Sequence, residues 1–227
     1  MLLIPEIETV VILVPRTGSK ALRLAIAERY PRAMQLYRHM EADGVPQGYD
    51  RWRRIGVVRD PVDRLWSLYR YLKWMGGQRD GMGKWEPVYV EKQRRSAELP
   101  FDQWLVENQT VFTSPYDSAC GDKFYPGFAV RHPLPENRKS QFIYLRPDLG
   151  TEVWRYADVD RLFDALGVVP GAHNQNASES APHLSSAASE HIQRWFAWDI
   201  DAARGAAKAA VSDIGEPVDP IAWRTMV

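Results

Sequence analysis

The stretch TVVILVPRTGSKALRLAIAER, residues 9–29, decides the fold class of this chain. Residues 9–14 form a short, continuously apolar and largely β-branched run, which predicts a strand buried on both faces of a sheet. Residues 15–20 make a tight polar loop, and the strong helix formers that follow are stopped by Pro31. The stretch therefore predicts a strand, a loop and a helix in direct succession.

A second strand and helix follow in the same order. Residues 54–58 predict a buried strand, and Asp60 and Pro61 supply an N-cap and a first-turn proline for a helix with apolar residues at helical spacing. We also expect a weak strand at 33–37, a strand at 141–145 and helices at 101–108, 159–166 and 189–210. This alternation predicts an α/β fold with a central, mostly parallel sheet flanked by helices.

Length and periodicity predict the domain organisation. The 227 residues are expected to form a single domain, residues 1–215, followed by a C-terminal tail, residues 216–227. Between about residues 74 and 139 the periodicity fades, which indicates an irregular insertion at the surface.

The composition excludes several classes of protein. The 29 lysines and arginines balance the 29 aspartates and glutamates, which disfavours a nucleic-acid partner or a polybasic membrane binder. A single cysteine, Cys120, allows neither an intramolecular disulfide nor a cysteine-built zinc site. The first residues lack a charged signal-peptide region, and their longest apolar run is too short to span a bilayer. We therefore expect a soluble, cytoplasmic protein with no membrane span.

The loop after the first predicted strand has the features of an anion site. A small-residue turn that opens a helix directs backbone N–H groups and the positive end of the helix dipole at one spot. Thr17, Gly18 and Ser19 let the backbone wrap closely, and Arg16 and Lys20 add positive charge. The alternative is an ordinary turn with basic residues at the surface. A magnesium-binding P-loop is disfavoured, because its first glycine is missing and Ala21 replaces the hydroxyl residue that would hold the metal.

The second predicted strand ends in another candidate anion site. Arg59 closes this strand, and Ser67 lies about two turns into the next helix, so that both side chains can converge on one anion. The alternative is a capped helix with a solvated arginine, in which Asp60 and Arg64 brace the first turn. Two anion sites at the carboxyl ends of neighbouring strands suit a nucleotide with phosphate groups at both ends of its ribose.

Both segments resemble those of the sulfotransferases that use 3′-phosphoadenosine 5′-phosphosulfate (PAPS). PRTGSK, residues 15–20, is similar to the 5′-phosphosulfate loop P-K-[TS]-G-[TS]-[TS] of that family. RDPVDRLWSLY, residues 59–69, is similar to its 3′-phosphate segment R-[DHN]-P-x-x-R-x-x-S-x-Y. The resemblance is specific over about the first 75 residues and diffuse after Gln141. Two departures stand out: Arg16 replaces the loop lysine of the family, and Lys20 replaces a hydroxyl residue.

The resemblance implies a three-layer, P-loop-like fold and a transferase that moves the sulfuryl group of PAPS to a hydroxyl or amine of a carbohydrate or small molecule. The 5′-phosphosulfate would bind to residues 16–20, with Arg16 also stabilising the leaving oxygen, and the 3′-phosphate would bind to Arg59 and Ser67. Sulfuryl transfer needs in-line positioning and cations at the leaving oxygen, so we expect no metal. Two other classes stay open: a P-loop kinase or phosphotransferase, and a non-catalytic nucleotide- or glycan-binding module.

The acceptor side is less well marked. A base must take the proton of the acceptor, and we expect His39 in this role, with Glu41 and Asp43 as alternatives in the same loop. Trp74 and Trp85 are candidates for acceptor contact, because aromatic faces stack on sugars. Neither the acceptor nor the oligomeric state can be read from the sequence.

Overall fold

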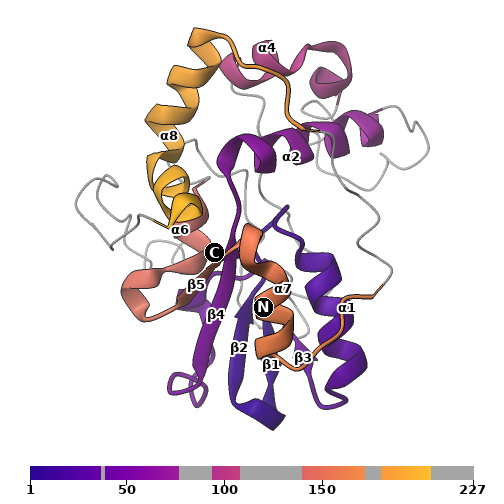
Figure 1. Cartoon of the computed structure of the whole chain (residues 1–227), viewed down its shortest axis with the longest axis vertical. Coiled ribbons are helices and arrows are strands. Elements are labelled where there is room, and N and C mark those ends of the chain that lie inside the picture. The colour runs from indigo at the N-terminus through magenta and orange to yellow at the C-terminus, as the bar shows by residue number, and fades with distance from the viewer. Residues whose placement is uncertain (37–38, 77–93, 108–139, 172–179, 206–227) are drawn as a thin grey trace, which may run out of the picture.

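The fold is seen in a computed structural model that describes residues 1–36, 39–76, 94–107, 140–171 and 180–205 (Figure 1). It contains a five-stranded sheet in the order β3-β1-β2-β4-β5. The strands are β1 (Leu2–Ile4), β2 (Thr9–Ile12), β3 (Met34–Gln35), β4 (Arg53–Val58) and β5 (Glu152–Arg155). The predicted strands at 9–14 and 54–58 are thus confirmed, and the weak strand at 33–37 is reduced to two residues.

The sheet is mixed, and the prediction of a mostly parallel sheet is wrong. β4 pairs in parallel with β2 and β5, whereas β1 pairs antiparallel with β2 and β3. The reason lies in the link between β1 and β2, which is a single 3-10 turn (Pro5–Ile7) closed by Glu8 in a left-handed conformation, φ 47°. So short a connection permits only antiparallel pairing, because a parallel crossover needs a dozen or more residues.

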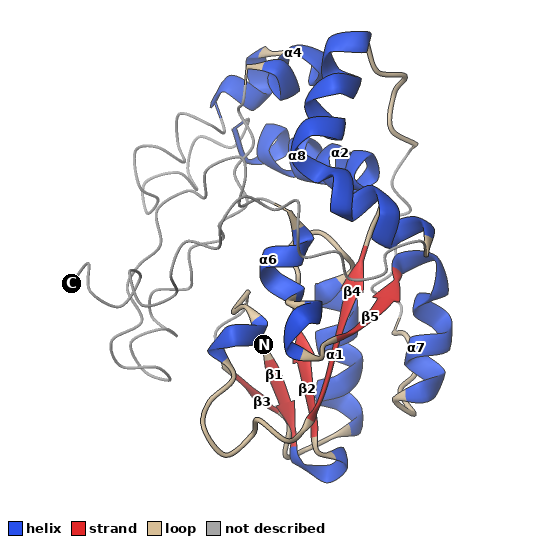
Figure 2. Ribbon diagram, turned by 90° about the vertical axis from the view of Figure 1, so that its left-hand side faces the viewer, coloured by secondary structure: helices blue, strands red, loops and turns tan. Residues whose placement is uncertain are grey.

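Helices cover both faces of the sheet and gather beyond one end of it. Figure 2 shows α6 on one side of the sheet and α1 and α7 on the other, with α2, α4 and α8 beyond the end of β4. The bounds are α1 (Ser19–Arg29), α2 (Pro61–Gly76), α4 (Phe101–Val106), α6 (Gln141–Leu145), α7 (Val159–Ala165) and α8 (Ser186–Arg204). Three buried apolar clusters fill the spaces between these layers.

The two helix starts that matter for the site follow the local sequence signals. α1 begins directly after Gly18, as the loop predicts. Asp60 caps α2, because its Oδ1 accepts the N–H groups of Val62 at 2.9 Å and Asp63 at 3.3 Å. The buried strand β4 therefore passes into α2 through only two residues, Arg59 and Asp60.

The prediction of a strand at 141–145 is wrong, because this segment forms α6. The Ser140 hydroxyl accepts the N–H of Phe142 at 3.2 Å and so caps the helix, and Arg146 ends it with φ 46°. A short apolar run does not distinguish a strand from a buried helix. Two strands of the sheet, β1 at residues 2–4 and β5 at residues 152–155, were not predicted from the sequence.

The predicted insertion at 74–139 is described only in part. Residues 94–98 are helical, and the predicted helix at 101–108 is confirmed as α4, which packs Trp104 and Leu105 into the apolar cluster shared with α2 and α8. The predicted tail, residues 216–227, lies outside the described residues. Within the described ranges, no helix combines the length and apolar character that a membrane crossing needs.

Candidate functional site

The two predicted anion segments meet at the carboxyl ends of β2 and β4. These strands are neighbours and pair in parallel, so the loop after β2 and the residue after β4 leave the same edge of the sheet. Arg59 Nη1 donates to the carbonyl of Arg16, 3.4 Å away. The structure therefore brings together the two segments that the sequence singled out.

The loop has a backbone shape that suits an anion. Arg16 and Gly18 both adopt left-handed conformations, with φ 67° and 76°. Alternation of left-handed and ordinary residues turns successive N–H groups toward one concave spot. The buried Thr17 hydroxyl donates to the carbonyl of Val14 at 3.0 Å, so its proton closes the loop internally and does not point to a ligand. Gly18 is the N-cap of α1 and offers no side chain to the first-turn N–H groups.

Arg16 and Ser67 contact each other directly. Arg16 Nε donates to Ser67 Oγ at 3.2 Å, and Arg16 Nη2 donates to Ser67 Oγ at 2.9 Å and to its carbonyl at 3.0 Å. The guanidinium also lies over the ring of Tyr71, 4.9 Å from its centroid. Residues that were expected at opposite ends of one nucleotide are thus in hydrogen-bond contact.

A second cation acts on Arg16. Burial lowers the pKa of Arg16, Tyr71 opposes this effect, and the nearby positive charge of Arg59 lowers the pKa further. Two guanidinium groups that repel each other at one spot create a local field that an anion would neutralise. This arrangement agrees with the expected anion site, and an ordinary turn with basic residues stays the alternative.

Tyr156 connects the loop to Arg59. The Arg59 side chain is buried, and its guanidinium lies over the Tyr156 ring, 4.8 Å from the centroid. The same ring lies close to Gly18, where an added Cβ would lie 3.0 Å from Tyr156 Cε2. Glycine is therefore favoured at this position both by its φ and by the close approach of the ring. The sequence analysis missed Tyr156, because it follows a strand that was not predicted.

The backbone of Arg59 is held by a buried side chain. Gln141 Oε1 accepts the Arg59 N–H at 2.9 Å, and Gln141 Nε2 donates to the Arg59 carbonyl at 2.7 Å. The amide group thus satisfies both backbone groups at the end of β4, where no further strand residue pairs with them. No local signal marks Gln141 for this role, since it lies 82 residues away in the chain.

Arg64 points into the protein instead of bracing Asp60. It is fully buried, its Nε donates to the carbonyl of Pro15 at 3.0 Å, and its Nη1 lies 3.7 Å from Asp199 Oδ2. Burial lowers the pKa of Arg64 to about 10, and burial raises the pKa of Asp199. This ion pair therefore lies directly beneath the anion loop.

His39 lies beside the carboxyl end of β2. Its Nδ1 is 2.6 Å from the carbonyl of Leu13, at the end of β2. A carbonyl only accepts, so Nδ1 carries a proton and Nε2 is the basic nitrogen of the neutral ring. Glu41 is buried, and Asp43 lies 3.7 Å from Arg146 Nη1.

The remaining predicted residues lie around this centre. Ser19 and Lys20 occupy the first turn of α1, and Lys20 is exposed. Trp74 is 57% exposed on α2, and its ring centroid lies 6.3 Å from that of the exposed Tyr71. Trp85 and Cys120 lie outside the described residues. In the described ranges, no cluster of three or more histidine, cysteine or acidic residues forms a metal site.

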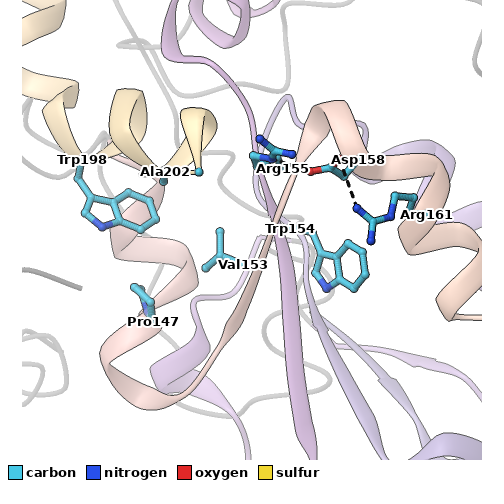
Figure 3. Close-up of a pocket in the computed structure, with 9 residues that line it drawn as sticks. Pro147, Val153, Trp154, Arg155, Asp158, Arg161, Trp198 and Ala202 are labelled. Atoms are coloured by element: carbon cyan, nitrogen blue, oxygen red, sulfur yellow. Dashed lines mark hydrogen bonds and ion pairs between the residues drawn. The ribbon is translucent and has the colours of Figure 1, made fainter. Parts of the chain in front are cut away.

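A cavity of about 340 Å³ lies elsewhere, between β5 and the end of α8 (Figure 3). Val153 of β5 lies on the same side as Trp198 of α8, whereas the side chain of Trp154 points to the other side of the strand. None of the residues predicted for the anion site lines this cavity, so the candidate site is the cationic loop and not this cavity.

Comparison of the chain with models of protein families, with curated proteins and with solved structures gives no match. Its function is therefore argued from the geometry of the site and from the resemblance of its two segments.

Proposed function

We propose that this chain is a sulfotransferase of the P-loop-like type that transfers a sulfuryl group from PAPS to a hydroxyl or amine. The observation that carries the proposal is the convergence of Arg16 and Arg59, whose charges repel across the edge shared by β2 and β4. The position of the two segments at the carboxyl ends of neighbouring parallel strands supports a ligand with two anionic ends.

The site residues divide between the two ends of the donor. The N–H groups of residues 18–20 at the start of α1 would hold the 5′-phosphosulfate, as helix N-termini hold anions. Arg16 would stabilise the leaving oxygen, where a fixed cation lowers the barrier because charge develops there. Arg59 and Ser67 would bind the 3′-phosphate. The exposed Lys20 would add positive charge at the first turn of α1.

His39 would serve as the base. Its Nδ1 donates to the Leu13 carbonyl, which fixes the tautomer, and Nε2 is the basic nitrogen that would take the proton of the acceptor hydroxyl. A base of this kind contributes about 10²–10⁴-fold to the rate. We therefore assign proton removal to His39 in preference to Glu41 or Asp43.

The acceptor would be a carbohydrate or a carbohydrate-bearing small molecule. Tyr71 and Trp74 form an exposed aromatic pair on α2, and Tyr71 touches the Arg16 guanidinium. Aromatic faces of this kind stack on the apolar faces of sugars. A sugar on this pair would lie beside the proposed leaving oxygen.

A thermal-shift series tests the proposal. Adenosine 3′,5′-bisphosphate should raise the melting temperature more than adenosine 5′-monophosphate or ATP with magnesium, because ligand binding to the folded state stabilises it. Arg59→Ala should weaken bisphosphate binding about 10–100-fold, which corresponds to about 1.5–3 kcal/mol for a charge-assisted hydrogen bond. Arg161→Ala, in the exposed part of α7, is the matched control and should leave binding unchanged.

The same series separates the alternatives. Equal responses to all three nucleotides would refute the two-ended site, and a preference for ATP with magnesium would favour a phosphotransferase. Tight bisphosphate binding without turnover on a panel of sugar and phenol acceptors would favour a binding module. Transfer of labelled sulfate from PAPS to a sugar acceptor, lost in His39→Ala, is the expected result.

A further inference from the structure

A single buried carboxylate connects the two halves of the candidate site from a distant part of the chain. Asp199 lies on α8, has no exposed surface, and accepts hydrogen bonds from Ser140 Oγ at 2.5 Å and from the Gln141 N–H at 2.9 Å. Its second oxygen faces Arg64 Nη1 at 3.7 Å. Arg64 and Gln141 each continue to a different anion segment.

The first branch reaches the loop. Arg64 Nε donates to the carbonyl of Pro15 at 3.0 Å, and Pro15 directly precedes Arg16. Asp199 stabilises Arg64 in this orientation, because its negative charge compensates the buried guanidinium. Asp199 therefore fixes the point from which the loop departs.

The second branch reaches Arg59. Asp199 holds the first N–H of α6, and the side chain of that same residue, Gln141, binds both the N–H and the carbonyl of Arg59. The position of the Arg59 backbone thus follows the position of α6, which Asp199 sets.

We propose that Asp199 is a positioning residue that fixes the spacing between the loop and Arg59, and thereby makes the site selective for ligands with anions at both ends. This inference rests on the proposed function, since it assigns the selectivity of that same site. A purely apolar contact between α8, α6 and α2 would stabilise the fold at least as well, because burying charges is costly. The polar network instead ends on backbone atoms of the two anion segments, which is what positioning requires.

Calorimetric titration of Asp199→Asn tests the selectivity. The measured quantity is the ratio of the dissociation constants for adenosine 5′-monophosphate and adenosine 3′,5′-bisphosphate. The ratio should fall about tenfold or more. If the loop or Arg59 is misplaced, the bisphosphate loses the contacts with one of its two phosphate groups, and a loss of 1.4 kcal/mol corresponds to a factor of ten. Adenosine 5′-monophosphate needs only one of the two anion segments, so its affinity should change less when the distance between the segments changes. Gln141→Met should lower the ratio as well, with the affinity for the monophosphate unchanged.

A control and a second variant distinguish a change in selectivity from a general loss of stability. Leu105→Ala removes a buried side chain of α4 that makes no hydrogen bond to the network, and it should leave the ratio unchanged. If Asp199→Asn does not fold, Ser140→Ala removes one of its hydrogen bonds while the ion pair stays, and it should lower the ratio in the same direction.

Hydrogen exchange gives a readout that does not depend on any ligand. In Asp199→Asn the Arg59 amide should exchange at least tenfold faster relative to the Ile55 amide in the middle of β4. Unaltered exchange at Arg59 would overturn the positioning role. A wild-type protein that prefers the bisphosphate, with the same ratio in Asp199→Asn, would overturn the selectivity alone. A wild-type protein without any preference would refute the proposed function and the selectivity with it, while the exchange result would still decide the positioning.

Discussion

Gly18→Ala is the substitution whose effect on the site can be worked out most directly. Gly18 has φ 76°, and a Cβ there would lie 3.0 Å from Tyr156 Cε2. The left-handed conformation costs a residue with a side chain about 1–2 kcal/mol. Displacing the Tyr156 ring from its preferred rotamer adds about 0.5–1.5 kcal/mol. We therefore expect the free energy of unfolding to fall by about 1.5–3.5 kcal/mol.

The control separates the two contributions. Gly150 has a similar φ, 83°, and nothing within 4 Å of its Cβ position, so Gly150→Ala should show the backbone cost alone. Urea unfolding measures both variants. The extra cost at Gly18 should disappear when Tyr156→Leu is combined with Gly18→Ala, because the ring that opposes the new methyl group is then absent.

The same substitution should weaken nucleotide binding. The Tyr156 ring lies under the Arg59 guanidinium at 4.8 Å, so a shift of the ring moves a proposed ligand of the 3′-phosphate. Gly18→Ala should therefore bind adenosine 3′,5′-bisphosphate less tightly than Gly150→Ala does. The role of the Gly18–Tyr156 contact is refuted if Gly18→Ala and Gly150→Ala lower the free energy of unfolding and the affinity for the bisphosphate equally, and if the effects of Gly18→Ala and Tyr156→Leu simply add.

Three further predictions follow from other contacts. Asp199→Asn should lower the free energy of unfolding by about 3–5 kcal/mol, because it removes the negative charge that faces the buried Arg64, and Arg64→Met combined with it should cost less than the sum of the single variants in urea unfolding. Trp74→Ala should raise KM for a sugar acceptor several-fold while the dissociation constant for the bisphosphate stays unchanged; an equal effect on both would contradict acceptor stacking. A hydrogen bond from Arg146 lowers the pKa of Asp148, so this pair stabilises the fold above the ordinary aspartate pKa and loses its effect as the pH falls through the lowered value. Wild type and Asp148→Asn should therefore differ in melting temperature at pH 6 and converge in strong acid, and a difference that persists there would exclude the ion pair as its cause.

The parts of the fold that could be predicted are those with local signals. The run of apolar residues at 9–14, the small-residue turn and the Asp60 cap each act within a few residues, and β2, α1, β4 and α2 form where they indicate. The site depends on these same elements, which is why its two segments could be placed at one edge of the sheet. β1 was not predicted, and its antiparallel direction depends on the turn at Pro5–Ile7 and not on the apolar pattern.

The supporting residues of the site could not be predicted because their contacts are distant in the chain. Gln141 reaches Arg59 across 82 residues, and Asp199 reaches Gln141 across 58. The apolar pattern predicts a strand at 141–145, and in a strand successive side chains would point to alternate faces of the sheet. As a helix capped by Ser140, it directs Gln141 to the end of β4.

In the proposed site, Arg16 would attract a ligand and Arg64 supports the fold, and their different partners explain this difference. Arg64 is matched by a buried carboxylate, so its charge is compensated inside the protein and adds little field at the surface. The described partners of Arg16 are neutral: the Ser67 hydroxyl and carbonyl, and the Tyr71 ring. Neutral partners fix the guanidinium without cancelling its charge, which stays available to an anion. In the proposed site, one arginine would therefore bind the ligand while the other supports the fold, and the position of one carboxylate, Asp199, separates the two roles.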